Sequence, residues 1–161
     1  MDLDPALDVR DYRMPAEWAP HAGTILTWPH RPALWRGVHE PVQALFARLA
    51  AELSEVEAVH LNVPNRTWQA TALDLIRRAG GELRNLVWHL VDSDDVWARD
   101  HGPIFVRPAT EKAPHPLVMI DWGFNAWGGK FASSLDDQVP RAMNRDLGLP
   151  RVEPGLVMEG G

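Results

Sequence analysis

An alternation of strand and helix patterns in the first half of this sequence narrows its possible folds more than any other feature. Residues 39–53 carry apolar side chains at helical spacing, and a second helix is expected from Asn65, a suitable cap, to about Ala79. Neighbouring parallel strands need such crossover helices, so the order predicts an α/β fold. The flanking runs of strand length are residues 24–28, 56–63 and 86–91.

The remainder of the chain is less regular. The first 23 residues contain three prolines and few periodic apolar positions, so we expect an irregular lead-in there. No internal repeat or low-complexity segment is visible, and a chain of this length is expected to form one domain, residues 1–161. The further elements expected are strands at 103–106 and 117–122, a helix at 136–147 and a final strand at 152–158.

The composition excludes several classes of protein. The 161 residues contain no cysteine, which excludes disulfides, cysteine-ligated zinc, iron–sulfur clusters and a thiolate nucleophile supplied by these residues. The formal net charge is −6, which disfavours nucleic acid or an anionic membrane surface as a partner and suits a small cationic ligand.

No apolar run approaches the roughly 20 residues of a membrane span. The N-terminal residues are acidic and interrupted by Pro5 and Pro15, unlike a signal peptide. We therefore expect no membrane association and a cytoplasmic location.

Tryptophan is unusually frequent, with eight in 161 residues. Trp68 and Trp88 fall inside expected regular elements, where core packing is the simplest interpretation. Trp97 and Trp127 lie in irregular stretches, where functional residues are common and an indole face can bind a cation.

Residues 92–103 form an acidic segment that ends in a Gly-Pro turn. It lacks the glycine and the terminal glutamate of a calcium loop, and most of its aspartates are equally well explained as a solvated loop. Asp100 differs because it lies two residues before Gly102 of this rigid turn, where a fixed carboxylate could grip a planar guanidinium group. Its neighbour Arg99 is expected to pair with Asp100 or with a nearby residue.

Residues 121–130 are rich in glycine and tryptophan. Two interpretations remain open from the residues alone: a tight loop whose aromatic side chains fill the core, or the wall of an active site with Asn125 as a fixed polar group. The histidines show no His-x-x-x-His spacing, and Ser133-Ser134 lack the setting of a nucleophilic serine.

Taken together, five motifs in order closely resemble those of agmatine deiminases and the related bacterial peptidyl-arginine deiminases. Each motif is moderately specific alone, and their shared order is highly specific. The resemblance covers essentially the whole sequence, which corresponds to about the first half of a family member. The motifs are Met14-Pro-Ala-Glu-Trp-Ala-Pro-His21, Thr27-Trp-Pro-His30, Trp97-Ala-Arg-Asp-His-Gly-Pro103, Asp121-Trp-Gly-Phe-Asn-Ala-Trp-Gly-Gly-Lys130 and Met158-Glu-Gly-Gly161.

The resemblance implies a fold and a reaction. The fold is the pentein, or α/β-propeller, with five ββαβ-type modules around an axis, of which this sequence would supply about the first half. The reaction hydrolyses a guanidine to a urea and ammonia without a metal or organic cofactor; for agmatine the product is N-carbamoylputrescine. A cysteine thiolate attacks the guanidinium carbon, a histidine acts as acid and base, and carboxylates hold the guanidinium nitrogens.

Carried over by position, the resemblance assigns roles to individual residues. Asp100 matches a guanidinium-binding aspartate, and Trp97 matches an aromatic residue of the substrate channel. Glu159 matches the catalytic glutamate that orients the histidine. The stretch that holds Asn125 and Trp127 matches a signature that shapes the substrate pocket. His101 lies where the family varies, so it receives no role.

The sequence departs from the family in two essential residues. It contains neither the His-x-Asp motif nor the cysteine, both of which follow Glu-Gly-Gly in the family. We therefore expect these 161 residues to be inactive without the missing C-terminal half. The alternatives are a non-enzymatic guanidinium-binding module, specificity for peptidyl arginine, and an α/β domain whose motifs only pack. The net charge favours agmatine, a dication, and self-association is expected only from the resemblance.

Overall fold

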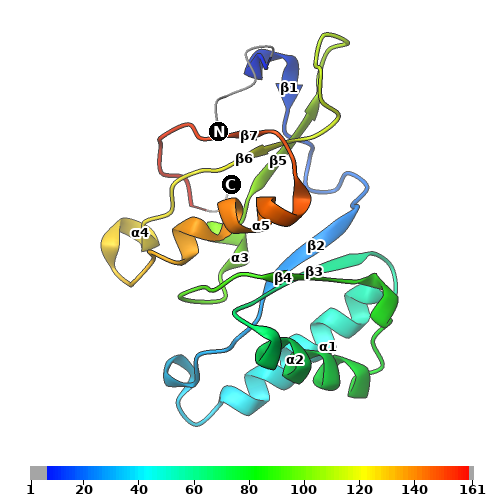
Figure 1. Ribbon diagram of the computed structural model, residues 1–161, viewed down its shortest axis with the longest axis vertical. Coiled ribbons are helices and arrows are strands. Elements are labelled where there is room, and N and C mark those ends of the chain that lie inside the picture. The colour runs from blue at the N-terminus through cyan, green and yellow to red at the C-terminus, as the bar shows by residue number, and fades with distance from the viewer. Residues whose placement is uncertain (1–6, 160–161) are drawn as a thin grey trace.

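The computed structural model describes residues 7–159, which form two sheets, one above the other in Figure 1. The lower sheet is parallel throughout, in the order β2-β3-β4. The α/β order predicted for this half is confirmed, because α1 follows β2 and α2 follows β3. These elements are β2 (Gly23–Thr27), α1 (His39–Ser54), β3 (Ala58–Val63), α2 (Arg66–Arg78) and β4 (Leu86–Leu90).

Both helices cover the same face of this sheet (Figure 1). Each new strand joins the same edge of the sheet, and both crossover connections have the same hand, so both helices lie on one face of the sheet. Alternate residues of β3, namely Val59, Leu61 and Val63, point into this interface and are fully buried. Trp68 and Trp88 pack against the same cluster, as their positions in regular elements predicted.

The opposite face of the sheet packs against α5 (Val139–Leu147) through Val91, Val139 and Met143. A polar chain also crosses this interface. His89, fully buried, places Nδ1 2.9 Å from Asp146 Oδ2 on the helix and Nε2 2.9 Å from His60 Nδ1 on the neighbouring strand. Burial, followed by the effect of His89, lowers the pKa of His60.

The upper sheet has the order β1-β5-β6-β7, with β6 and β7 parallel and the other neighbours antiparallel. Along the chain, β5 and β6 are followed by the α4 turn (Ala126–Gly129) and a 3₁₀ turn, then by α5 and β7, an order compatible with the expected ββαβ module. The closure of such units into a five-module propeller stays a prediction. The four strands are β1 (Tyr12–Arg13), β5 (Ile104–Pro108), β6 (Val118–Ile120) and β7 (Arg151–Val152).

The sequence prediction was wrong at both ends of this sheet. The supposedly irregular lead-in contains β1, whose Tyr12 and Arg13 pair with the far end of β5. The final strand, predicted over residues 152–158, ends at Val152, and only one isolated bridge, Gly123 with Val157, continues the pairing. Gly155, at φ 70°, turns the chain between these two points.

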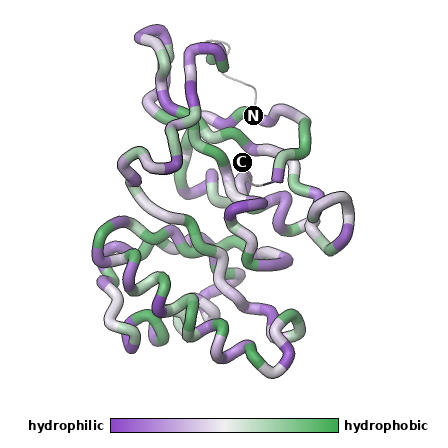
Figure 2. Tube along the Cα trace, turned by 180° about the vertical axis from the view of Figure 1, so that it is seen from behind, coloured by the Kyte–Doolittle hydropathy of each residue, from purple (hydrophilic) through white to green (hydrophobic). Residues whose placement is uncertain are grey.

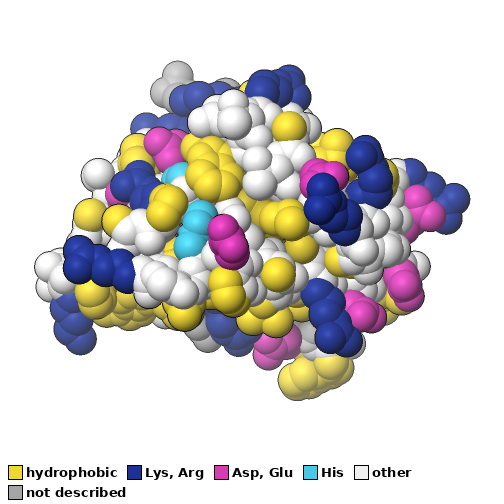
Figure 3. All heavy atoms as spheres, turned by 90° about the horizontal axis from the view of Figure 1, so that it is seen from below, with side chains coloured by type: hydrophobic (Ala, Val, Ile, Leu, Met, Phe, Trp, Pro, Cys, Tyr) yellow, Lys and Arg dark blue, Asp and Glu magenta, His cyan; other side chains and the backbone are white. Residues whose placement is uncertain are grey.

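Hydrophobic and polar positions alternate along the helices that cover the lower sheet (Figure 2). The face seen from below carries basic and acidic side chains interspersed among hydrophobic ones (Figure 3). Within residues 7–159, no helix has both the length and the apolar character needed to cross a bilayer. The remaining short elements are the 3₁₀ turns Val9–Asp11, Pro32–Trp35, Leu83–Asn85 and Asp136–Gln138, and the helical turns α3 (Ala98–His101) and α4 (Ala126–Gly129).

Candidate active site

The five predicted site residues lie in three short segments that the fold brings together. Trp97 and Asp100 belong to the turn that contains α3, Asn125 and Trp127 to the turn that contains α4, and Glu159 follows the last bridge of the upper sheet. Contacts connect all five: Trp127 contacts Trp97, Asp100 and Glu159, and Asn125 joins them through Glu159.

The α4 turn is left-handed. Ala126 (φ 52°), Trp127 (φ 54°, ψ 48°), Gly128 (φ 85°) and Gly129 all have positive φ, and Gly129 N–H donates to the Asn125 carbonyl at 2.7 Å. Glycine adopts this conformation freely, but alanine and tryptophan each lose about 1–2 kcal/mol in it. The loop predicted from its glycines is therefore present, with strain at two positions that are not glycine.

Asn125 stabilises this turn through its side chain. Its Oδ1 accepts a hydrogen bond from Gly128 N–H at 2.7 Å. The amide oxygen of Asn125 is therefore occupied by the backbone of its own loop.

Glu159 contacts the same turn from outside. Its Oε1 accepts hydrogen bonds from Trp127 N–H at 2.8 Å and from Asn125 N–H at 3.1 Å. No residue between 7 and 159 donates to Oε2, so Oε1 alone makes the hydrogen bonds to the turn.

Asp100 lies on the other side of Trp127. The indole Nε1–H of Trp127 points to Asp100 Oδ1 at 3.3 Å. Arg99 does not pair with Asp100, which corrects one of the two expectations for it, but forms an ion pair with Glu17 at 2.9 Å. Among the described residues, Asp100 Oδ2 has no hydrogen-bond donor.

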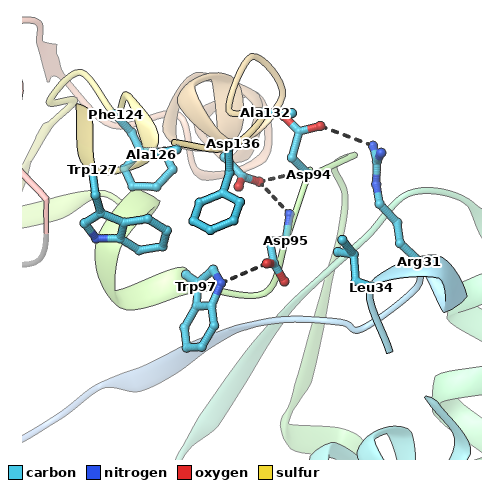
Figure 4. A pocket seen from close by; sticks show the side chains of 11 residues that line it. Arg31, Leu34, Asp94, Asp95, Trp97, Phe124, Ala126, Trp127, Ala132 and Asp136 are labelled. Carbon is cyan, nitrogen blue, oxygen red and sulfur yellow. Dashed lines mark hydrogen bonds and ion pairs between the residues drawn. The ribbon is translucent and has the colours of Figure 1, made fainter. Parts of the chain in front are cut away.

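Trp97 packs edge-on against Trp127, with ring centroids 6.2 Å apart, and donates its indole N–H to Asp95 Oδ2 at 2.9 Å. Beside this pair lies a cavity of about 310 Å³ (Figure 4). Its aromatic walls come from both turns, and its polar wall carries three aspartates and one arginine. The lining includes Trp97, Phe124, Trp127, Phe131, Asp94, Asp95, Asp136 and Arg31.

Asp136 is a buried carboxylate that the sequence analysis did not single out. Only 1% of it is exposed, and its Oδ1 accepts the N–H groups of Asp94 at 2.7 Å and Asp95 at 3.2 Å (Figure 4). Burial outweighs these hydrogen bonds and raises the pKa of Asp136 to about 6. Arg31 lies 3.6 Å from Asp94, so the one cation in the wall is already paired.

His101, the last residue of α3, is buried, with 2% of it exposed, and its ring meets Phe124 edge-on with the ring centroids 6.0 Å apart. Burial lowers the pKa of His101 to about 4, with partial opposition from the backbone of His101 and Asp95, so the ring is neutral near pH 7. Its position supports the aromatic wall.

Comparison with known proteins gives one family and a set of named relatives. The family of Porphyromonas-type peptidyl-arginine deiminases matches residues 13–161. The agmatine deiminase of Ectopseudomonas mendocina is 36% identical over 157 residues, covering 93% of this chain and 40% of the relative. That of Pseudomonas aeruginosa is 38% identical over 156 residues, with the same two coverages.

A solved structure of an agmatine deiminase also matches this chain. The agmatine deiminase of Enterococcus faecalis superimposes with a TM-score of 0.76 at 29% identity, covering 94% of this chain and 40% of that structure. The chain thus spans about two fifths of the length of the proteins that it matches.

Proposed function

The chain belongs to the Porphyromonas-type peptidyl-arginine deiminase family, and from that membership we propose that it supplies the guanidinium-binding part of an agmatine deiminase-type hydrolase. The proposed reaction converts agmatine and water to N-carbamoylputrescine and ammonia. The observation that carries the proposal is the convergence of Asp100, Trp97 and Glu159 on Trp127 from segments far apart in the sequence.

Asp100 is proposed to bind the guanidinium group. Its Oδ1 is oriented by the Trp127 indole, which leaves Oδ2 for a guanidinium N–H. The edge-on pair of Trp97 and Trp127 gives the adjoining wall an aromatic surface, which attracts a delocalised cation. Holding this cation in place is the main task, because resonance makes its carbon a poor electrophile and alignment lowers the barrier to attack.

Glu159 is proposed to orient a catalytic histidine through its Oε2, because Oε1 is used by the left-handed turn. A carboxylate that accepts a histidine N–H fixes the ring orientation and stabilises the imidazolium form. That histidine and the thiolate are proposed to come from residues outside these 161, since the sequence holds no cysteine and no His-x-Asp motif.

In the proposed reaction, the thiolate sulfur bonds to the guanidinium carbon, and the histidine protonates the nitrogen that departs as ammonia. The histidine then takes a proton from water, whose oxygen bonds to the same carbon as the carbon–sulfur bond breaks. Without the thiolate the first bond cannot form, so the 161 residues alone are proposed to be inactive.

The cavity beside Trp97 supports agmatine over a substrate that carries a free carboxylate. Asp94, Asp95 and Asp136 line it, and Arg31, the one cation among the described residues of its wall, already lies beside Asp94. A distal ammonium group is compatible with this wall, whereas an α-carboxylate would meet like charges.

Ammonia release tests the proposal directly. The purified chain is assayed with agmatine alone, and again after co-expression with the part of the Ectopseudomonas mendocina enzyme that lies outside its match to this chain. We expect no ammonia from the chain alone and restored release from the pair. Activity should be lost when the added part has its cysteines replaced by serine or when this chain carries Asp100→Asn.

Two outcomes would contradict the proposal. Ammonia release by the chain alone would exclude the thiolate mechanism. An active pair in which Asp100→Asn has no effect on KM or kcat would remove Asp100 from the substrate site. Faster turnover of a peptidyl arginine than of agmatine would change the substrate and keep the reaction.

A further inference from the structure

We infer that Trp127 is a positioning residue that couples Asp100 to Glu159, and that Glu159 Oε1 maintains this coupling by holding the left-handed turn. The inference rests on the proposed function, because it concerns the carboxylates assigned there to guanidinium binding and to histidine orientation. It assigns Glu159 a task that needs no histidine.

Within residues 7–159, no hydrogen bond joins the two carboxylates directly, but each accepts a hydrogen bond from a different part of one residue, Trp127. The backbone N–H of Trp127 donates to Glu159 at 2.8 Å, and the indole N–H of Trp127 points to Asp100 at 3.3 Å. The distance between the two carboxylates is therefore set by the conformation of a single tryptophan.

Packing fixes the side chain in that conformation. The ring of Trp127 meets Trp97 at 6.2 Å, Phe124 at 5.5 Å and Phe131 at 6.1 Å, edge-on in each case. An indole held by three aromatic neighbours cannot turn independently of its backbone, so a change in the turn displaces the indole N–H.

Hydrogen bonds fix the backbone. The left-handed conformation of Trp127, at φ 54°, is unfavourable for a residue with a side chain, so it persists only where the surroundings enforce it. Two groups do so here: Glu159 Oε1, which accepts two N–H groups of the turn, and the Asn125 side chain, which accepts a third. Removing the Glu159 acceptor should therefore displace the indole from Asp100.

The experiment uses ¹⁵N-labelled chain and follows the indole N–H signal of Trp127, assigned by its loss in Trp127→Phe. Glu159→Ala removes charge and acceptor together, whereas Glu159→Gln removes the charge and keeps an acceptor oxygen. We expect Glu159→Ala to shift the Trp127 indole signal and Glu159→Gln to keep it near its wild-type position. Glu57→Gln, at a carboxylate bonded to Thr24 in the other sheet, is the matched control.

Agmatine binding, measured by calorimetry on the same proteins, provides the functional readout. We expect Glu159→Ala to weaken binding by about threefold to tenfold more than Glu159→Gln, the size of one lost hydrogen bond. Equal weakening would mean that Glu159 acts on the ligand only through its charge and would overturn the inference. So would an indole signal that is unchanged in Glu159→Ala.

A second variant keeps the test decisive if Glu159→Ala fails to fold, which the indole signal of the distant Trp28 would reveal. Asp100→Ala removes the acceptor of the Trp127 indole from the other end, and we expect it to shift the backbone amide signal of Trp127 as well as its indole signal. An unchanged amide signal would refute the coupling. A wild-type chain that binds no agmatine, but shows both coupled shifts, would refute the proposed binding role and leave the coupling intact.

Discussion

Replacing Asp136 by asparagine should stabilise this protein near neutral pH and leave its stability unchanged in acid. Asp136 has 1% of its surface exposed and faces a cavity wall that also holds Asp94 and Asp95. Its Oδ1 accepts two backbone N–H groups, at 2.7 and 3.2 Å. Asparagine can present an oxygen of the same shape to both donors without burying a negative charge.

The magnitude follows from the pKa of Asp136, which burial raises from 3.8 to about 6. Between these values the unfolded chain has released the proton while the folded chain still holds it. The free energy of unfolding therefore falls as the pH rises through this range and is constant above it. The full shift corresponds to at most about 3 kcal/mol. We expect a gain of about 1–2 kcal/mol, because the neutral amide oxygen of asparagine accepts the two N–H groups more weakly than the carboxylate does.

Urea unfolding at pH 4, 5, 6 and 7.5, followed by tryptophan fluorescence and far-UV circular dichroism, measures this effect. We expect Asp136→Asn to match wild type at pH 4 and to exceed it by about 1–2 kcal/mol at pH 7.5, a midpoint shift of about 0.5–1 M. Asp136→Ala leaves both donors unpaired and should be less stable at every pH. Asp74→Asn, at an exposed ion pair with Arg78, is the control and should show no such pH dependence.

The reasoning would be refuted if Asp136→Asn were less stable than wild type at pH 7.5, or if its advantage were the same at pH 4. Either result would mean that the hydrogen bonds of the carboxylate outweigh its desolvation. The other carboxylates of the chain titrate in both proteins and cancel in the difference.

Three further predictions concern the fold. Asn65→Ala removes the side chain that accepts Trp68 N–H at 3.1 Å and should lower the unfolding free energy by about 1 kcal/mol, whereas Asn65→Asp should keep most of it. Ile76→Ala empties a fully buried site between α2 and the sheet and should cost about 2–5 kcal/mol in urea unfolding; a loss under 1 kcal/mol would contradict the packing. Gly128→Ala places a Cβ in open space at φ 85°, so the unfolding free energy should fall by about 1 kcal/mol through backbone conformation alone. Thermal unfolding measures this loss, and an unchanged midpoint would contradict the prediction.

The lower sheet was predictable because its information is local. Each strand and helix there carries its own periodicity, and Asn65 caps α2 where the sequence placed the cap. The upper sheet was predicted less well because its strands are short and their pairing is distant. Tyr12 pairs with Pro108, and no pattern in two residues can indicate a partner so far along the chain.

The site shows the same division. The candidate site residues were predicted from the resemblance of their motifs, and the structure places Trp97, Asp100, Trp127 and Glu159 in one connected group. The connections could not be predicted, because each depends on the backbone conformation of one turn. Asp136 was missed because its position at the start of a helix is where an exposed acidic residue is also common.

The conformation of the α4 turn explains why local rules fail where they do. The next two residues are glycines, and a glycine in place of Trp127 would also remove the strain there, but it would supply no indole. Trp127 places its indole against Asp100 at a cost of about 1–2 kcal/mol in left-handed backbone conformation. Here that side chain reaches Asp100 while its own backbone reaches Glu159. One residue can bond to both carboxylates only with this strained backbone, so the strain and the two hydrogen bonds have a single cause. Sequence propensity describes residues one at a time and cannot reveal such a cause.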